Sequence, residues 1–250
     1  MLTPIGCPVY DLSGKTALVT GASSGLGAHF STVLAERGAN LILAARRMDA
    51  LERLAAELRS KGRGTVVTAQ LDVTEPRSIA QTFGPGAVID ILINNAGVVR
   101  SAPALEQSEA DWDGVMDTNL KGVFLVAQAA AKAMRASNKG GSIINVASIL
   151  GVRQSSTVLP YAVSKAGVIQ MTKVLALELA RFNVRVNALV PGGVESGQND
   201  TFKTRYSARI PLARMAQADE MVGALVYLAS DASSYVTGHC LVVDGGLSAW

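Results

Sequence analysis

Tyr161 and Lys165 are the residues of this chain whose types and spacing best suit proton transfer. They follow Pro160 at the start of a helical pattern, and a separation of four residues places them on one helical face, one turn apart. A phenol ordinarily has a pKa of about 10, and a neighbouring ammonium group favours the phenolate and lowers that value. The spacing therefore predicts that Tyr161 acts as a general acid and base near neutral pH. Many helices carry an exposed tyrosine and lysine at this spacing, so the rest of the chain decides what the pair means.

A glycine-rich turn at Gly21–Gly27 is the second candidate site. It follows an apolar, β-prone run at Thr16–Thr20 and precedes a helical pattern, an arrangement that directs backbone N–H groups and a helix N-terminus at an anion. Its spacing differs from the usual GxGxxG fingerprint, and such turns also serve only to pack a helix on a sheet. The same residues fit the Gly-x-Ser-x-Gly pattern of serine hydrolases, with Ser23 as nucleophile. That alternative needs a histidine base, for which His29 and His239 are the candidates, and nothing marks an oxyanion-hole loop.

The elements that must position these residues are short apolar runs alternating with amphipathic helical patterns. Strands are predicted at Thr16–Thr20, Asn40–Ala45, Thr65–Leu71, Val88–Ile93, Gly141–Val146, Val184–Val190 and Cys240–Val243. Helices are predicted at His29–Arg37, Asp49–Lys61 with Asp49 as N-cap, Pro76–Phe83, Ser108–Ala136 with a bend near Asn119 and Gly122, Tyr161–Arg181 and Asp219–Ala229. This alternation predicts one α/β domain over residues 1–250. Its sheet would be a Rossmann-type, doubly wound parallel sheet of about seven strands with helices on both faces.

In such a sheet, ligands bind at the carboxyl ends of the strands. The notable residues that follow predicted strands are Gly21, Asp72, Asn94, Ser148 and Pro191. We therefore expect one cleft at this edge of the sheet. Residues 194–211 are polar and weakly patterned, and we expect them to form a mobile substrate lid over the cleft.

Composition and charge exclude several other classes of protein. The chain has 250 residues, 49% of them hydrophobic and 5% aromatic, which suits helices packed on a buried parallel sheet. The net charge of +3 is spread out, so we expect no nucleic-acid partner. Cys7 and Cys240 form neither a disulfide framework nor a metal-binding motif, and no metal is expected. The first fifteen residues lack a signal-peptide pattern and no apolar run reaches membrane-spanning length, which predicts a cytoplasmic protein without a membrane partner.

Taken in order, the motifs resemble the classical short-chain dehydrogenase/reductase (SDR) family. The resemblance runs from Leu12 to Gly246 and rests on Thr20–Gly27, Asn94–Gly97, Ser148, Tyr161 with Lys165, and Pro191 with Gly192. It implies an NAD(P)-dependent oxidoreductase acting on CH–OH and C=O groups, assembled as a homotetramer or homodimer.

The same resemblance implies four catalytic residues. Tyr161 would protonate the carbonyl oxygen while the nicotinamide delivers hydride to the carbonyl carbon, and Ser148 would hydrogen-bond that oxygen. Lys165 would lower the pKa of Tyr161 and hold the nicotinamide ribose. Asn119 would position a water molecule linked to the lysine.

A cofactor groove is implied as well. Its expected residues are Gly21, Ser23, Ser24, Gly25, Leu26, Gly27, Arg46, Arg47, Asp72, Val73, Asn95, Ala96, Gly97, Tyr161, Lys165, Pro191, Gly192, Val194 and Ser196. In this family an acidic residue at the end of the second strand selects NAD, but Ala45 stands there and two arginines follow. Arginine suits a phosphate, so we expect NADP(H), with Arg46 as the main clamp and Arg47 as its helper. Ser24 replaces a basic residue of many NADP-dependent members, which leaves NAD(H) as the second candidate.

The substrate pocket is the least constrained part of the site. Its expected residues are Leu150, Val152, Arg153, Leu159, Gly193, Phe202 and Tyr206. Gly193 stands where the family often has a bulky residue, which predicts a roomier or more mobile pocket. Ser196 takes the place of a threonine that holds the nicotinamide carboxamide.

These mostly apolar residues predict a carbonyl reductase or secondary alcohol dehydrogenase whose small-molecule substrate is an apolar ketone or keto ester, or the matching alcohol. The alternatives are a sugar or sugar-acid (gluconate-type) dehydrogenase and a 3-oxoacyl thioester reductase. The residues before Tyr161 depart from those of acyl-carrier-protein reductases in this family, which counts against an acyl-carrier substrate. A catalytically silent dinucleotide sensor is the alternative from another class.

Overall fold

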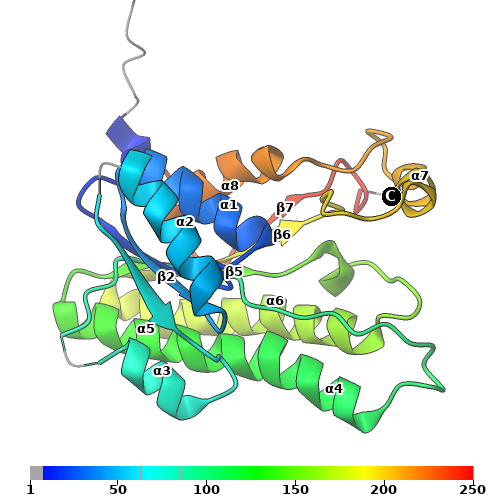
Figure 1. The fold of residues 1–250 in the computed structure, drawn as a ribbon, viewed down its shortest axis with the longest axis horizontal. Helices are drawn as coiled ribbons and strands as arrows, with labels where there is room; N and C mark the ends of the chain where they lie inside the picture. The colour runs from blue at the N-terminus through cyan, green and yellow to red at the C-terminus, as the bar shows by residue number, and fades with distance from the viewer. Residues whose placement is uncertain (1–7, 62–63, 85, 250) are drawn as a thin grey trace, which may run out of the picture.

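In the computed structural model the chain folds into one parallel sheet covered by helices on both faces (Figure 1). The structure describes residues 8–61, 64–84 and 86–249, so the expectation for Cys7 lies outside it. Seven strands lie in the order β3-β2-β1-β4-β5-β6-β7, all parallel. Their bounds are β1 Thr16–Thr20, β2 Asn40–Ala45, β3 Val66–Gln70, β4 Ile91–Asn94, β5 Gly141–Val146, β6 Val184–Pro191 and β7 Cys240–Val243. The predicted fold class is confirmed.

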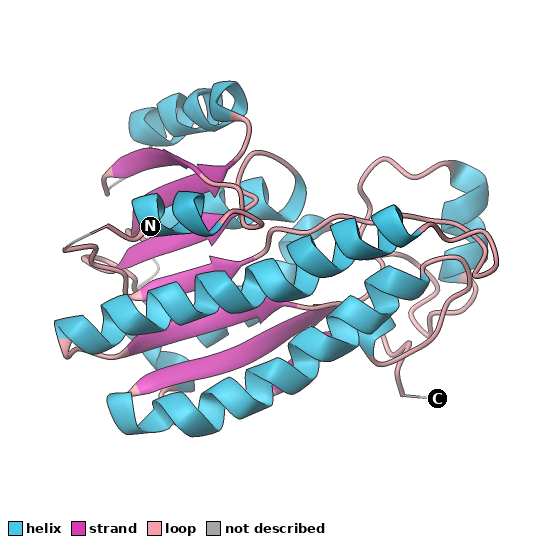
Figure 2. Cartoon of the chain, turned by 90° about the horizontal axis from the view of Figure 1, so that it is seen from below, coloured by secondary structure: helices cyan, strands magenta, loops and turns pink. Residues whose placement is uncertain are grey.

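Eight α-helices are present in the described part of the chain. They are α1 Gly25–Glu36, α2 Met48–Lys61, α3 Pro76–Thr82, α4 Glu109–Met116, α5 Val123–Ser137, α6 Leu159–Leu179, α7 Asp200–Ser207 and α8 Val222–Ala229. Helices α1, α2 and α8 cover one face of the sheet, and α3 to α6 cover the other (Figure 1). On that second face, the run from α4 to α5 and the long α6 lie side by side across the strands (Figure 2). No helix of the described residues is long and apolar enough to span a bilayer.

The two helical layers bury two separate cores, because neighbouring residues of a strand point to opposite faces. In β1, Ala17 and Val19 belong to the core under α1, α2 and α8, which includes Phe30. Leu18 points to the other core, with Met134 of α5. The sheet is therefore buried on both sides, and its free ligand-binding surface is the edge where the strands end.

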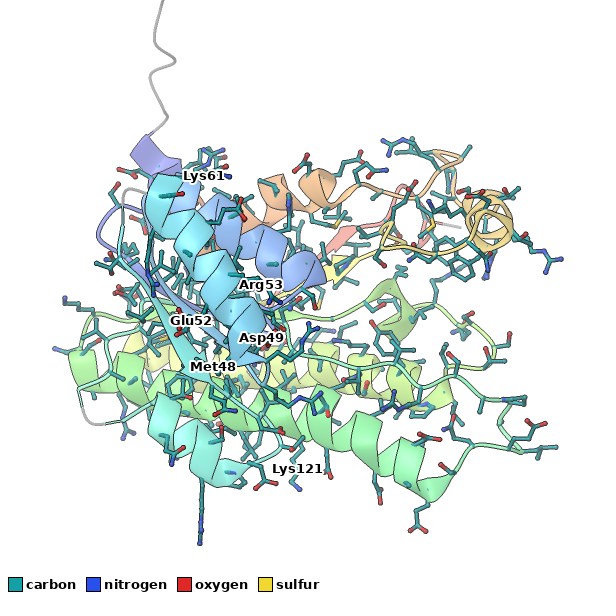
Figure 3. The ribbon with its side chains drawn as sticks, in the orientation of Figure 1. Met48, Asp49, Glu52, Arg53, Lys61 and Lys121 are labelled. Atoms are coloured by element: carbon teal, nitrogen blue, oxygen red, sulfur yellow. The ribbon has the colours of Figure 1, made fainter. Side chains whose placement is uncertain are left out.

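Several element boundaries differ from the sequence-based prediction. Helix α1 begins at Gly25 rather than His29, so the later glycines of the turn belong to its first turn. Helix α2 begins at Met48, which places Asp49 inside the first turn rather than at the N-cap, where its carboxylate pairs with Arg53 at 3.1 Å (Figure 3). Strand β4 begins at Ile91 rather than Val88, and the carboxylate of Asp90, just before it, accepts a hydrogen bond from the backbone N–H of Thr16.

Two of these differences concern the site directly. The bend expected in the helix at 108–136 is a π-helical segment, η2 Asp117–Gly122, which joins α4 to α5. The expected lid at 194–211 is not only loop, because it contains α7, whose N-cap Asn199 accepts a hydrogen bond from the N–H of Phe202 at 2.8 Å. The Asn-Asp start signal was overlooked in a polar segment.

Candidate active site

Two adjoining cavities lie at the carboxyl ends of the strands. The first, which we call the groove, has a volume of about 650 Å³ and runs past the ends of β1, β2, β3 and β4. The second, the catalytic cavity, has a volume of about 510 Å³ and lies beside the ends of β5 and β6. Both are lined by Leu26, Asn95, Gly97, Val194 and Ser196, so they form one continuous cleft.

Ser148, Tyr161 and Lys165 come together in the catalytic cavity. Ser148 follows β5 and caps the 3₁₀ turn η3, Ile149–Gly151, where its hydroxyl accepts a hydrogen bond from Leu150 N–H at 3.2 Å. Tyr161 and Lys165 lie in the first turns of α6. Lys165 is 3% exposed, and its ammonium group donates a 2.7 Å hydrogen bond to the carbonyl oxygen of Val146. The structure thus places a phenol, a hydroxyl and an ammonium group around one cavity.

The electrostatics of Tyr161 differ from the prediction. Burial raises the pKa of the phenol above its ordinary value, and a hydrogen bond with Ser148 only partly opposes this rise. Burial also lowers the pKa of Lys165 to about 8, and its nitrogen lies 5.7 Å from the centroid of the Tyr161 ring. The expected lowering of the Tyr161 pKa by Lys165 was therefore wrong for this state of the protein. At neutral pH the phenol carries its proton, which is the form that can protonate a carbonyl oxygen.

Asn119 lies in the π-helical segment η2, buried beside this cluster. Its amide makes a pair of hydrogen bonds with the main chain of Val98, accepting from N–H and donating to the carbonyl oxygen, each at 2.8 Å. A methyl group built on the adjacent Gly97 would lie 3.3 Å from the Asn119 Oδ1 and 3.7 Å from the Lys165 Nζ. Asn119 therefore fixes the strand-end turn against which the lysine packs.

The turn after β4 is clamped to β1 by Thr20. Its buried hydroxyl accepts hydrogen bonds from the N–H groups of Asn95 at 2.9 Å and Ala96 at 3.0 Å, and Asn95 Nδ2 donates to the Thr20 carbonyl at 3.1 Å. Asn94, by contrast, points into the sheet, where its amide donates to the Val123 carbonyl oxygen at 2.7 Å. The clamp holds the groove residues Asn95 to Gly97 at the centre of the cleft.

The glycine turn has the form of an anion cradle. Gly21 and Gly25 have φ angles of +67° and +56°, which favour glycine. Ser24, the N-cap of α1, makes no side-chain cap hydrogen bond. The first N–H groups of the helix thus keep their capacity to bind an anion, and the helix dipole favours negative charge there.

Gly27 brings α1 close to the turn, and Gly27→Ala is expected to be costly. A Cβ at this position would lie 2.3 Å from the carbonyl oxygen of Gly21 and 2.6 Å from Asn95 Nδ2. The backbone must shift, so we expect the free energy of unfolding to fall by roughly 1–3 kcal/mol, measured by urea denaturation. Gly114→Ala, where a Cβ meets nothing within 4 Å, is the matched control. Equal stabilities of the two variants would contradict this account of the turn.

Two arginines and an aspartate line the far end of the groove. Arg47 donates hydrogen bonds to the hydroxyls of Ser23 at 3.0 Å and Ser24 at 2.9 Å. Burial acts to raise the pKa of Asp72, but hydrogen bonds from Thr74 and the charge of Arg46 together hold it below its ordinary value. In the structure it is therefore Arg47, rather than the expected main clamp Arg46, that lies against the glycine turn. Both guanidinium groups are exposed and line the groove, as does Val73.

The contacts around Ser23 do not suit a nucleophile. Its hydroxyl accepts a hydrogen bond from Arg47, whose guanidinium cannot take up a proton. The ring of His29 is turned to Asp219, with 2.9 Å between Nε2 and Oδ1. Among the described residues, no group of His, Cys, Asp or Glu is arranged to hold a metal ion either.

The expected substrate residues divide into two sets. Leu150, Gly193, Phe202 and Tyr206 line the catalytic cavity. Val152, Arg153 and Leu159 do not line it and instead line a separate cavity of about 610 Å³ on the outer side of the start of α6. The turn η3 leads the chain out of the cleft immediately after Leu150, which lines both cavities.

Three further residues line the catalytic cavity. Gln198 also lines the catalytic cavity, where its amide donates to the carbonyl oxygen of Val194 and the hydroxyl of Ser196, each at 3.0 Å. Ser101 and Met215 line it too. Met215 lies beyond the expected lid, and no local pattern marks it.

Gly193 does not enlarge the pocket, contrary to the prediction. A Cβ at this position would lie 2.2 Å from Cε1 of Tyr206, so the tyrosine ring occupies the space that a bulky residue 193 would fill.

Comparisons with known proteins agree with this geometry. A family model described as Enoyl-(Acyl carrier protein) reductase matches residues 21–248. The 3-oxoacyl-[acyl-carrier-protein] reductase of Thermotoga maritima is 41% identical over 247 residues, covering 94% of this chain and 98% of the relative. The 2-dehydro-3-deoxy-D-gluconate 5-dehydrogenase of Escherichia coli is 38% identical over 247 residues, covering 95% and 96%.

Solved structures are similar over nearly the whole chain. A gluconate 5-dehydrogenase from Burkholderia cenocepacia, in complex with NADP and tartrate, has a TM-score of 0.91 and 35% identity, covering 97% of this chain and 98% of that one. A short-chain type dehydrogenase/reductase from Mycobacterium marinum has a TM-score of 0.90 and 40% identity, covering 96% and 98%.

Proposed function

The chain belongs to the short-chain dehydrogenase/reductase family, whose members are oxidoreductases of CH–OH and C=O groups, and we propose that it is an NADP(H)-dependent dehydrogenase of a gluconate-type sugar acid. The observation that carries the proposal is the lining of the catalytic cavity, where neutral hydrogen-bonding side chains accompany Ser148 and Tyr161. These are Ser101, Gln198 and Tyr206. Such groups suit a substrate with several hydroxyl groups better than the apolar ketone expected from the sequence.

The relatives support the same change of substrate. Dehydrogenases of gluconate or its derivatives occur both among the similar sequences and among the similar structures. Together with the similar 3-oxoacyl-[acyl-carrier-protein] reductase of Thermotoga maritima, they support a sugar acid or a 3-oxoacyl thioester better than an apolar ketone. Membership of an oxidoreductase family also argues against the serine hydrolase and the silent sensor.

The catalytic residues would act on the carbonyl oxygen. When NADP(H) is bound, its nicotinamide supplies hydride to the carbonyl carbon or accepts it from the alcohol. Tyr161 donates its proton to the oxygen during reduction and takes it back during oxidation. Ser148 hydrogen-bonds the same oxygen and stabilises its developing negative charge. Lys165, held by the Val146 carbonyl oxygen, places a positive charge 5.7 Å from the centroid of the Tyr161 ring.

The groove residues fit the phosphates of the cofactor. The uncapped start of α1 would bind the pyrophosphate, and Arg46 and Arg47 would bind the 2′-phosphate that distinguishes NADP from NAD. Ser196, already held by Gln198, would bind the nicotinamide carboxamide.

Arg46→Ala and Arg47→Ala are each expected to raise the KM for NADPH and leave the KM for NADH nearly unchanged. Removing a charged hydrogen-bond donor to a phosphate costs about 1.5–3 kcal/mol, which corresponds to roughly 10- to 100-fold in affinity. The measurement is initial rate against the concentration of each cofactor. Arg53→Ala, an exposed arginine of α2 paired with Asp49, is the control. Equal losses with NADH would contradict a role in reading the 2′-phosphate.

The proposed function is tested by NADPH oxidation with 5-keto-D-gluconate, acetoacetyl-CoA and acetophenone, followed by absorbance. We expect the highest kcat/KM with 5-keto-D-gluconate. Faster turnover of acetophenone would support the apolar ketone substrate expected from the sequence. No turnover of any ketone would overturn the proposal.

A 3-oxoacyl thioester is the second candidate, because one observation favours it. The cavity outside α6 is lined mainly by apolar residues and adjoins the catalytic cavity through Leu150. An acyl or thioester arm could extend along it, in keeping with the similar reductase of Thermotoga maritima. A preference for acetoacetyl-CoA in the same assay would select this candidate.

We also propose that the enzyme is a homotetramer. Support comes from exposed apolar side chains on α5 and α6, namely Phe124, Val163, Val174 and Leu177, the last of which is 84% exposed. Light scattering after size-exclusion chromatography measures the assembly directly, and a monomer would contradict the proposal. A cytoplasmic location stays a prediction.

A further inference from the structure

Tyr206 and Gly193 form an unusually close contact above the catalytic cavity. A Cβ on Gly193 would lie 2.2, 2.8 and 3.0 Å from three carbon atoms of the tyrosine ring. The φ angle of Gly193 is not in the left-handed region, so the backbone itself would accept alanine. The space that the ring needs is therefore what calls for glycine at this position.

The rest of α7 holds this ring in place. Phe202, one turn earlier, stacks on Tyr206 with ring centroids 5.5 Å apart and planes inclined by 18°. Tyr206 also packs against a small buried cluster formed by Ile149, Ile210, Met215 and Leu247. The ring is thus fixed on three sides, by the backbone of Gly193, by Phe202 and by the cluster.

The hydroxyl of Tyr206 belongs to the same electrostatic environment as the reacting groups. Burial raises the pKa of Tyr206, the charge of Arg209 opposes this rise, and Asp244 and Tyr161 add to it. Both tyrosines line the catalytic cavity. Ser148 and Tyr161 would serve the carbonyl oxygen, which leaves the second phenol free to bind another atom of the substrate.

We propose that Tyr206 is a substrate-binding residue whose hydroxyl hydrogen-bonds an oxygen on the carbon next to the reacting carbon, and that Gly193 makes room for it. This inference rests on the proposed function and narrows it to ketones that carry an adjacent oxygen. A phenol can donate to or accept from that oxygen, so it binds a hydroxyl group in either hydrogen-bonding sense.

The first test compares acetoin with 2-butanone, two four-carbon ketones that differ by one adjacent hydroxyl. We expect the wild type to have a higher kcat/KM for acetoin than for 2-butanone. Tyr206→Phe should lower this preference roughly tenfold, by lowering kcat/KM for acetoin and leaving kcat/KM for 2-butanone unchanged. Phenylalanine keeps the ring and its packing. Tyr235→Phe, at a fully exposed tyrosine, is the matched control and should leave the preference unchanged. No preference in the wild type, or an equal preference in Tyr206→Phe, overturns the proposal.

The second test needs no substrate. Gly193→Ala should lower Tm by roughly 2–6 °C in the wild-type background, because the ring must move. In the Tyr206→Ala background the same change should have little effect, since the ring is gone. Gly223→Ala, where a Cβ meets nothing within 4 Å, should lower Tm in neither background. If Gly193→Ala lowers Tm equally in both backgrounds, the Tyr206 ring is not the reason that position 193 needs glycine.

Failure of this inference and failure of the proposed function give different results. If 5-keto-D-gluconate is reduced but the acetoin preference does not depend on Tyr206, only the role of Tyr206 falls. If no ketone is reduced, the proposed function falls, and the substrate-binding role falls with it. The comparison of Tm values then still decides whether the Tyr206 ring requires glycine at position 193.

Discussion

Replacing Tyr161 with phenylalanine is expected to lower kcat for ketone reduction by roughly 10³-fold, because the substrate oxygen loses its proton donor. The ring stays, so the walls of the cavity and the position of Lys165 should change little. Stopped-flow or steady-state oxidation of NADPH measures the loss, and cofactor fluorescence should show NADPH binding within a few-fold of the wild type.

The pH dependence supplies an independent check on Tyr161. Reduction needs the protonated phenol, so its rate should fall as pH rises through the pKa of Tyr161, and oxidation should show the opposite trend. Because burial raises that pKa from 10.0, the falling limb that belongs to Tyr161 is expected above pH 10.0, separate from any loss of rate as Lys165, with a pKa of about 8, gives up its charge. Tyr235→Phe is the control at an exposed tyrosine. If Tyr161→Phe keeps its activity within threefold of the wild type, or shows the same fall of rate with pH, then Tyr161 is not the proton donor.

Lys165→Met is expected to abolish most activity and at the same time stabilise the protein. Burial lowers the pKa of the Lys165 ammonium group to about 8 in the folded chain, from an ordinary value of 10.5. At neutral pH this difference corresponds to roughly 3 kcal/mol of lost stability, from which about 1–2 kcal/mol must be subtracted because the variant leaves the Val146 carbonyl oxygen unpaired. We therefore expect a gain of about 1–2 kcal/mol in the free energy of unfolding, with kcat/KM lower by roughly 10²-fold or more.

The sign of this effect follows from proton binding. Below pH 8 both states hold the proton and the penalty is complete. Between about 8 and 10.5 the unfolded state holds it more strongly, so wild-type stability rises with pH, and above 10.5 the penalty disappears.

Urea denaturation at pH 7 and at high pH measures the effect, with Lys173→Met on the exposed side of α6 as control. The advantage of Lys165→Met should shrink as pH rises. If Lys165→Met is less stable than the wild type at pH 7, the buried charge of Lys165 does not destabilise the folded protein.

Sequence reasoning singled out the candidate catalytic residues because each lies in a local pattern. Tyr161 and Lys165 share one turn of a helix, and Ser148 directly follows a strand, so simple periodicity places all three at one edge of the sheet. The parallel, doubly wound sheet likewise follows from the alternation of strands and helices.

What sequence reasoning missed depends on contacts between distant segments. The contact of the Tyr206 ring with Gly193 brings helix α7 against the segment after β6, and no local sequence pattern marks it. The raised pKa of Tyr161 comes from burial, which exists only after folding. The outward course after Leu150 depends on one 3₁₀ turn, which moves Val152 and Arg153 to a different cavity.

The strand order also bears on how the chain can fold during its synthesis. Strands β1 to β4 come from residues 16–94 and lie together at one side of the sheet, and β5, β6 and β7 then add to the free edge of β4 in the order in which they leave the ribosome. No later strand has to insert between two that are already paired, because β2 and β3 add at one edge of β1 and β4 to β7 add in turn at the other edge. Most of the groove can therefore assemble before the segment that carries Ser148, Tyr161 and Lys165 has been made, and a nascent chain could acquire its phosphate-binding half before its catalytic half.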